Sequence, residues 1–239
     1  MGKVACVMVV MEYLKISGQL LNAKIKGGGV NKCHIMQPSH LRFTIHGLWP
    51  ANKSSSSSLN CMGDAFNVNE MDDALKKDLL SSWWDWKDGN HVEFWQREYD
   101  KHGKCSDNVF PKSKYFRKTL ATYRDFDIAQ ILQKANIVPQ PLQPKMSLYK
   151  LYSIDQITKA IESETGGHSV NIRCYQQEQK KSKKSKKGSN LLIFLAQVAL
   201  CYDESGNNRI DCDPGQTTSC KFNGGDPETA PSIAHIKLW

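Results

Sequence analysis

The sequence lacks several features that would place it in other classes of protein. Its N-terminal apolar stretch, Val4–Met11, is too short to cross a bilayer, which takes about 20 residues. No internal repeat is visible, and no linker separates two self-sufficient halves, because the serine run Ser54–Ser58 is short and is expected to form a surface loop. With 239 residues and 40% hydrophobic content, the chain is expected to form one domain with a proper core.

Cysteine and histidine residues spaced as in known metal sites are also scarce. The eight cysteines form no CxxC pair, and an HExxH motif would need histidines in place of Arg97 and Lys101. The pair His102 and Cys105 lacks a second ligand pair, so zinc is the disfavoured alternative. An even number of widely spaced cysteines instead suits disulfides of an oxidising compartment, although the sequence alone does not choose the pairs. We therefore expect a secreted, extracellular protein without a metal centre.

The first residues allow two interpretations. A single lysine precedes Val4–Met11, as in an abbreviated signal peptide, but no clear small-x-small cleavage site follows. The alternative is a first strand or helix of the mature fold. The sequon that begins at Asn52 is expected to carry a glycan if the chain is secreted.

Positive charge is concentrated in one segment. The net charge is +8, and removing the six lysines of KKSKKSKK (180–187) leaves +2, so the excess is weak support for a nucleic-acid site spread over the fold. The run is typical of a solvated loop; a nuclear-localisation signal or an RNA-gripping segment of a nuclear or ribosomal protein are the alternatives. The cysteines disfavour such an intracellular protein.

Residues 41–46 (LRFTIH) alternate with the period of a half-buried strand. The phenylalanine and isoleucine of this run would face the core, and His46 the opposite side. Gly47 and Pro50 are expected to end the strand, which places Trp49 in the loop beyond it.

Helical periodicity is clearest over Val92–His102, where Gly103 is well placed to stop the helix. Further helices are predicted at Glu70–Trp86, Lys114–Tyr123, Ile128–Ala135 and Ile154–Ser163. Two β-prone segments follow, Val170–Gln176 and Leu191–Tyr202, and the second has the nearly continuous apolar pattern of a central strand. The lysine run then lies at the tip of their hairpin. We predict a single α+β domain with a mainly antiparallel central sheet and several helices set apart from it.

Two histidines offer the groups needed to cleave RNA without a metal. A base must take the proton of the ribose 2′-OH, an acid must protonate the departing 5′-oxygen, and a cation must stabilise the charge on the phosphate. His46 and His102 suit the proton roles because the unperturbed pKa of imidazole is about 6.5, and Lys101 supplies a cation. Glu98 lies one helical turn before His102. We expect its carboxylate to pair with that ring and raise its pKa, as the helix C-terminus would also do.

Each of these residues also has an ordinary explanation. A lone His46 at a strand end is more often structural or merely exposed, and Glu98 with His102 could be a surface pair of adjacent helical turns. The aromatic residues near them would, taken singly, be assigned to the core.

Two long segments favour the catalytic explanation through a resemblance. FTIHGLWP (43–50) and FWQREYDKHGKC (94–105) resemble the two active-site segments of the ribonuclease T2 family. The likeness extends with less force over residues 33–220, including NIVP (136–139) and IRC (172–174). The chain looks most like plant members, particularly the basic S-RNases of self-incompatibility.

The resemblance implies an α+β fold and an endoribonuclease that cleaves single-stranded RNA through a 2′,3′-cyclic phosphate, with little base specificity and no cofactor. In that comparison His46 matches the general acid and His102 the base. Glu98 and Lys101 match the groups that support the phosphorane.

The resemblance also implies residues that bind substrate. Trp49, Phe94 and Trp95 fall where family members use aromatic rings to build the site or stack a base. Arg97 stands where many members have a histidine and could contact phosphate. Tyr99 replaces a tryptophan that is usual in the family.

By the same resemblance, three disulfides are expected: Cys61 with Cys105, Cys174 with Cys220, and Cys201 with Cys212. Family members begin with a strand that bears Q-W-P and a cysteine shortly before the equivalent of Cys33. Residues 1–32 lack this pattern, and Cys6 is the spare partner for Cys33. We therefore divide the chain into a divergent N-terminus, 1–32, with the possible remnant of a signal peptide, and a ribonuclease T2-like domain, 33–239.

The expected partner is single-stranded RNA, and no membrane is expected; the chain would act as a monomer. A self-incompatibility role would add an F-box type recognition partner from pollen. The alternatives are a ribonuclease of phosphate scavenging or defence, and a T2-fold recognition or RNA-binding protein whose altered N-terminus has cost it turnover.

Overall fold

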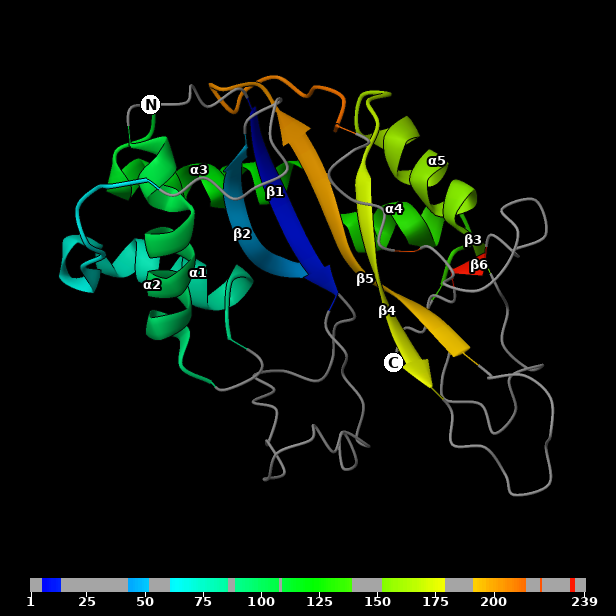
Figure 1. The fold of residues 1–239 in the computed structure, drawn as a ribbon, viewed down its shortest axis with the longest axis horizontal. Coiled ribbons are helices and arrows are strands. Elements are labelled where there is room, and N and C mark those ends of the chain that lie inside the picture. The colour runs from blue at the N-terminus through cyan, green and yellow to red at the C-terminus, as the bar shows by residue number, and fades with distance from the viewer. Residues whose placement is uncertain are drawn as a thin grey trace.

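A four-stranded antiparallel sheet forms the centre of the computed structural model (Figure 1). The structure describes residues 6–13, 43–51, 61–85, 89–107, 109–138, 152–178, 191–213, 220 and 233–234. The strands of the sheet, in spatial order, are β2 (Phe43–Ala51), β1 (Cys6–Tyr13), β5 (Leu191–Tyr202) and β4 (Asn171–Glu178). A second pair, β3 (Tyr152–Ser153) and β6 (Ile233–Ala234), is also antiparallel. The predicted α+β domain with an antiparallel sheet is confirmed, as is the internal position of β5.

The N-terminal part of the chain contributes β1, which lies between β2 and β5. Val9 is opposite Leu48 on one side and Leu200 on the other. Of the two interpretations of the first residues, the structure therefore has a strand. The division of the chain at residue 32 stays a prediction. Cys33, Asn52, the serine run and the lysine run 180–187 lie outside the described residues.

The predicted helices are all present among the described residues. They are α1 (Asp73–Ser82), α2 (His91–Lys101), α3 (Lys112–Asp125), α4 (Ile128–Lys134) and α5 (Ile154–Glu164), with 3-10 turns η2 (Val68–Glu70) and η3 (Gly103–Ser106). The helix predicted from Glu70 begins later because the Asp72 side chain caps it, accepting a hydrogen bond from the Leu75 N–H at 2.8 Å. It ends before Trp83, whose backbone leaves the helical region. The side chains of Asn90, Asp127 and Ser153 cap α2, α4 and α5 in the same way.

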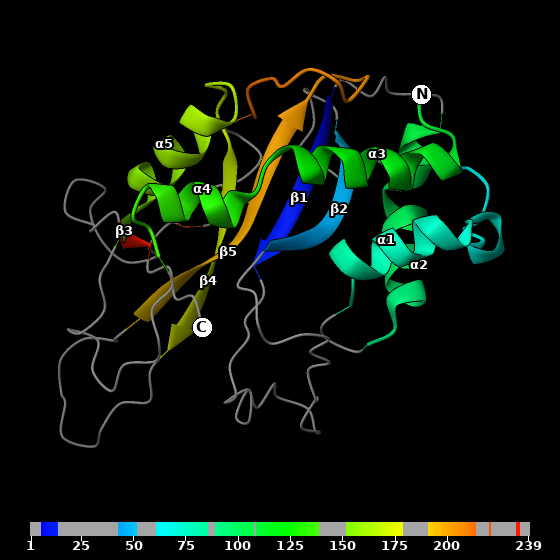
Figure 2. The same ribbon diagram turned by 180° about the vertical axis from the view of Figure 1, so that it is seen from behind.

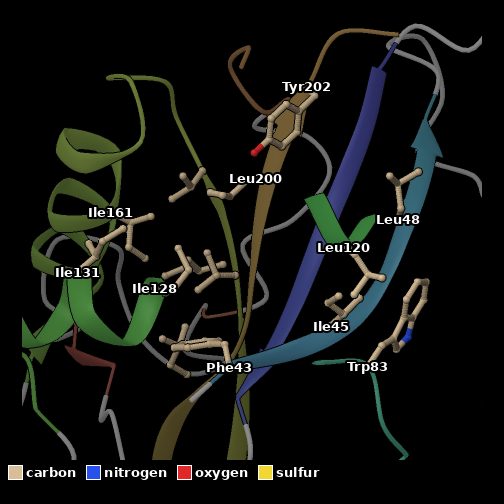
Figure 3. Packing of buried hydrophobic residues seen from close by; sticks show 14 of the residues in the cluster. Phe43, Ile45, Leu48, Trp83, Leu120, Ile128, Ile131, Ile161, Leu200 and Tyr202 are labelled. Carbon is tan, nitrogen blue, oxygen red and sulfur yellow. The ribbon is translucent and has the colours of Figure 1, made fainter. Parts of the chain in front are cut away.

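Helices α3 and α4 lie across one face of the sheet (Figure 2). Between these layers pack Phe43, Ile45 and Leu48 from β2, with Leu120 from α3 and Trp83 from the turn after α1 (Figure 3). All five are at most 3% exposed. Each large apolar side chain buried in this way contributes about 1.5–3 kcal/mol. This core holds β2 in place from one side.

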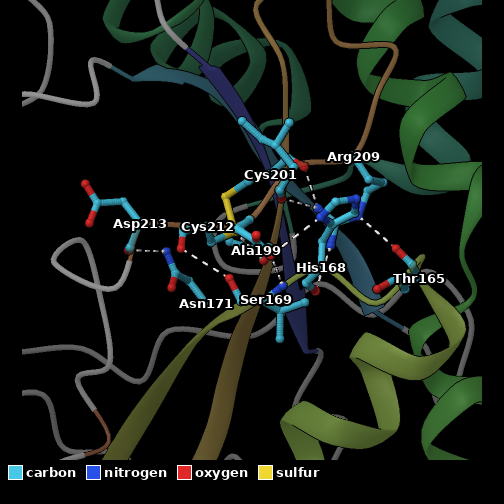
Figure 4. The surroundings of a disulfide bond; sticks show 12 residues. Thr165, His168, Ser169, Asn171, Ala199, Cys201, Arg209, Cys212 and Asp213 are labelled. Carbon is cyan, nitrogen blue, oxygen red and sulfur yellow. Dashed lines mark hydrogen bonds and ion pairs between the residues drawn. A yellow bond between two sulfur atoms is a disulfide. The ribbon is translucent and has the colours of Figure 1, made fainter.

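Three disulfides join described residues, and all three are the predicted pairs: Cys61–Cys105, Cys174–Cys220 and Cys201–Cys212. Beside the last of these, the Arg209 guanidinium donates to the carbonyl oxygens of Cys201 and Thr165 (Figure 4). The turn after β5 is thereby fastened to the end of α5. Within the described residues, no helix combines the length and apolar character that a membrane crossing requires.

Candidate active site

His46 sits at an irregularity of β2. Val10 of β1 pairs with Gly47 and Met11 pairs with Ile45, so the register skips His46, which forms a β-bulge. The prediction that Gly47 and Pro50 end the strand is wrong, because β2 continues to Ala51 and includes Trp49. A bulge absorbs the extra residue, and β2 is an edge strand of the sheet that the described residues form, where a proline such as Pro50 is tolerated.

The bulge changes which side chains share a face. Residues three apart in a regular strand point to opposite sides of the sheet. Here Ile45 and Leu48 are both buried, while His46 and Trp49 are both partly exposed on the other side. Their rings meet edge to face, with centroids 5.1 Å apart. The irregular strand therefore supplies an imidazole and an indole to the same site.

Glu98, from the last turns of α2, faces both of these rings. Its Oε1 lies 3.5 Å from His46 Nε2, and its Oε2 accepts a hydrogen bond of 2.8 Å from Trp49 Nε1. Burial alone would raise the pKa of this carboxyl, but hydrogen bonds and charge from His46, the Trp49 N–H and the charge of His102 lower it overall. Glu98 is therefore an anion that stabilises positive charge on the His46 ring.

His102 caps the C-terminal end of α2 and is 8% exposed. Its ring stacks on Trp49, with centroids 4.9 Å apart and planes at 25°. The Nε2 atom is buried and has no hydrogen-bond partner among the described residues. Trp49 thus contacts both histidines, and none of the described residues occupies Nε2 of His102.

The electrostatics of His102 correct a prediction. We expected Glu98 to pair with His102 and raise its pKa, but the carboxylate instead faces His46 and Trp49. Burial lowers the pKa of His102 to about 4, and the charges of Lys101 and His46 act in the same direction, against the opposite pull of Glu98. The ring is neutral at neutral pH, as a proton acceptor must be.

The end of α2 is shaped by a close contact at Gly103. A Cβ at this position would lie 2.3 Å from the Tyr99 ring, which is wholly buried. Glycine lets the chain turn tightly over that ring into η3, directly after His102. The helix stop predicted at Gly103 is confirmed, and its cause is packing.

The predicted substrate-binding aromatic residues separate into two kinds. Phe94 is partly exposed, and its centroid lies 5.9 Å from that of His46. Trp95 is 1% exposed and its Nε1 donates to the Trp83 carbonyl oxygen at 2.5 Å. The prediction that Trp95 binds substrate is therefore wrong in this structure, because its helical stripe faces the core.

The predicted cations of α2 also differ. Arg97 is bound to carboxylates, with Nη1 3.0 Å from Glu93 Oε1 and Nη2 3.8 Å from Asp85 Oδ2. Lys101 is exposed at the last turn and, among the described residues, forms no ion pair; its charge reaches His102. Lys101 is accordingly the freer of the two to meet a substrate anion.

Covalent and hydrogen-bond links hold the two segments together. Cys61, which follows β2 in the chain, is joined to Cys105 just beyond α2. From α3, the Tyr115 hydroxyl donates to the Leu48 carbonyl oxygen at 2.8 Å, and the Tyr123 hydroxyl donates to that of Phe43 at 2.7 Å. The backbone on either side of His46 is thus braced by one helix.

The sequence analysis did not anticipate two residues of the site. Gln197 of β5 places its Nε2 2.7 Å from His46 Nδ1. Arg173 of β4 places its guanidinium carbon 5.3 Å from the centroid of the Trp49 ring. Neither belongs to a motif of catalytic residues, and only the register of the sheet brings them to the site.

The geometry agrees with comparisons to known proteins. The sequence profile described as the Ribonuclease T2 family matches residues 19–212. The chain belongs to the ribonuclease T2 family. Ribonuclease DdI of Dictyostelium discoideum is 32% identical over 190 residues, which cover 79% of this chain and 74% of that protein. Ribonuclease S-7 of Nicotiana alata is 30% identical over 189 residues, covering 77% and 75%.

Solved structures give the same family fold. The ribonuclease MC1 from bitter gourd seeds superposes with a TM-score of 0.67 at 24% identity, over 91% of this chain and 97% of that one. At this identity the likeness supports the fold alone. It agrees with the α+β architecture that places the two histidines of this ribonuclease T2 family member in one site.

Proposed function

We propose that this ribonuclease T2 family member is an endoribonuclease that cleaves single-stranded RNA by transesterification through a 2′,3′-cyclic phosphate, without a metal or other cofactor. One observation carries the proposal. Trp49 contacts two imidazoles whose surroundings differ: His46 faces the Glu98 carboxylate, whereas the buried His102 has an Nε2 without a partner among the described residues. Metal-free cleavage of RNA needs such a pair, one acid and one base.

His102 is the base in this proposal. With a pKa of about 4 its ring is neutral at physiological pH, so Nε2 is able to accept the proton of a ribose 2′-OH. The 2′-oxygen then attacks the phosphorus and closes the cyclic phosphate. His46 is the acid that protonates the departing 5′-oxygen, because the nearby Glu98 carboxylate stabilises its charged form.

The remaining residues stabilise charge and hold bases. Lys101, exposed beside His102, provides the cation for the phosphorane, and Glu98 keeps His46 in place. The partly exposed Phe94 offers a ring face on which a base of single-stranded RNA stacks, whereas Trp49 is already stacked on His102. Arg97 would have to leave Glu93 to reach a phosphate.

Purified protein incubated with RNA in EDTA tests the proposal. We expect degradation with 2′,3′-cyclic phosphate ends, and loss of activity in the chelator would point to a metal. His102→Asn and His46→Asn should each lower kcat roughly 10²–10⁴-fold. His168→Asn is the matched control, because that histidine lies outside the site beside Asp211. Retention of RNA without cleavage by the wild type would instead indicate a recognition protein.

We also propose that the protein is a secreted monomer that carries a glycan on Asn52. The three disulfides support this proposal, because such bonds persist in oxidising compartments. The similarity to Ribonuclease S-7 supports a self-incompatibility role, with an F-box type partner in pollen. Transcripts confined to the style would agree with that role, whereas induction by phosphate starvation or wounding would favour scavenging or defence.

A further inference from the structure

Arg173 lies at the site without an assigned role. It belongs to β4, and its guanidinium carbon is 5.3 Å from the centroid of the Trp49 ring, within the range of a cation–π contact. The same indole contacts both histidines. The positive charge of Arg173 therefore contacts the same indole that contacts the proposed acid, His46, and the proposed base, His102.

The register of the sheet gives an independent reason to place Arg173 at the site. Arg173 is directly opposite Gln197 on β5, and residues paired in this way project from the same face. Gln197 reaches His46 Nδ1 at 2.7 Å. The contact with Trp49 and the pairing with Gln197 thus both place Arg173 on the face of the sheet that carries the site.

Among the residues that the structure describes, no carboxylate pairs with Arg173. Arg173 is only partly exposed and, within that part of the chain, forms no ion pair, whereas Arg97 is bound to Glu93. The carboxylate nearest the site, Glu98, faces His46 and Trp49 instead. A partly buried arginine without an anion is available to a ligand that supplies one, and its planar fork fits phosphate oxygens.

We propose that Arg173 binds an RNA phosphate at the face of Trp49 and so fixes the strand against the two histidines. It approaches from the sheet, whereas Lys101 approaches from the end of α2. The substrate chain would then pass between a cation on each side. This inference rests on the proposed function, because it assigns a phosphate contact of the same site.

Two variants separate charge from packing. Arg173→Met and Arg173→Lys both keep an aliphatic stem against Trp49, but only the lysine keeps a positive charge. We expect Arg173→Met to lower kcat/KM about tenfold, as for the loss of one charged hydrogen bond, and Arg173→Lys to lose less. The dependence of log KM on log salt should become shallower by about 0.7 in the methionine variant alone. Arg124→Gln is the control, since it removes one charge from an ion pair with Asp78 on α1.

Substrates of two lengths show which RNA phosphate Arg173 contacts. Loss on a dinucleoside monophosphate as well as on a longer RNA assigns Arg173 to the scissile phosphate, and loss on the longer RNA alone assigns it to a neighbouring one; both support the inference. Equal kinetics and salt slopes in the wild type and both variants would overturn it, as would an equal loss in the methionine and lysine variants.

Binding of a 2′-deoxy oligonucleotide, which cannot be cleaved, keeps the inference separate from the proposed function. If the wild type fails to cleave RNA but binds this ligand, weaker binding by Arg173→Met still supports a phosphate contact. Unchanged binding in that variant rejects the contact. Thermal melts of each variant show whether a loss reflects unfolding.

Discussion

Replacing Gly47 by alanine would put a methyl group into the hydrogen bond that joins β2 to α2. An ideal Cβ at this position lies 2.3 Å from Glu98 Oε2 and 2.5 Å from Trp49 Nε1, the two atoms of that bond. Carbon and oxygen in contact are about 3.3 Å apart, so the carboxylate must move by about 1 Å. Gly47 does not have a positive φ, and alanine is therefore compatible with the backbone. The clash alone decides the outcome.

The cost follows from what the carboxylate holds. Losing a hydrogen bond to a charged group lowers the free energy of unfolding by about 1.5–3 kcal/mol. In a domain of this size that corresponds to a fall in Tm of roughly 3–12 °C. A displacement of about 1 Å in a catalytic group lowers the rate by about 10²-fold. We expect Gly47→Ala to show both effects in thermal melts and in RNA cleavage assays.

A double-mutant cycle with Glu98→Ala gives the decisive control. If Gly47→Ala acts by displacing the carboxylate, it should cost less stability in a chain that has already lost that carboxylate, where only the contact with Trp49 remains. Strict additivity of the two changes in unfolding free energy would refute the reasoning. So would an unaltered Tm and kcat/KM in the single variant.

Other consequences are open to measurement. As the pH is lowered, kcat/KM should begin to fall only near pH 4, the lowered pKa of His102. A fall that begins near pH 6.5, the ordinary pKa of histidine, would contradict the burial of that ring. In the unfolded chain the His102 ring takes up a proton near pH 6.5, whereas in the folded chain it does so only near pH 4. The free energy of unfolding should therefore fall by about 3 kcal/mol as the pH drops from 6.5 through 4, and urea melts of His102→Asn should show a smaller fall. Tyr115→Phe leaves the buried Leu48 carbonyl oxygen unsatisfied and should cost about 1–3 kcal/mol in thermal melts, with equal Tm values arguing against the brace. Replacing Cys61 and Cys105 by alanine opens a loop of 44 residues and should cost about 4 kcal/mol in urea melts, and an unchanged midpoint would show that the disulfide does not constrain the unfolded chain.

Local patterns predicted most of the elements. The apolar run Leu191–Tyr202 is β5 with the same bounds, and the periodicity of Val92–His102 differs from α2 by one residue at each end. Both signals are contained in the segment itself. The end of β2 was misplaced because the bulge at His46 depends on pairing with β1, a strand distant in sequence. An edge position, which Pro50 requires, is likewise a property of the whole sheet.

Parts of the site needed the tertiary structure for the same reason. The spacing of Glu98 and His102 indicates a contact along one helix, but packing of α2 against β2 turns the carboxylate toward His46. The helical period shows which side chains of α2 share a face, but it does not say that the face with Trp95 is the one packed against the core. Arg173 is brought to the site by strand register; the resemblance covers it in IRC (172–174) but implies no role for it.

The position of β1 has a consequence for how the chain reaches its native state. Of the described strands β1 comes first in the chain, and it is inserted between two others, of which β5 ends as late as Tyr202. Until that late segment has been synthesised, β2 is the one described neighbour with which β1 can pair, and the other edge of β1 stays open. Contacts between such distant residues slow folding and prolong the exposure of unpaired strands. Assembly of this sheet is therefore the step at which a folding catalyst or chaperone would matter most.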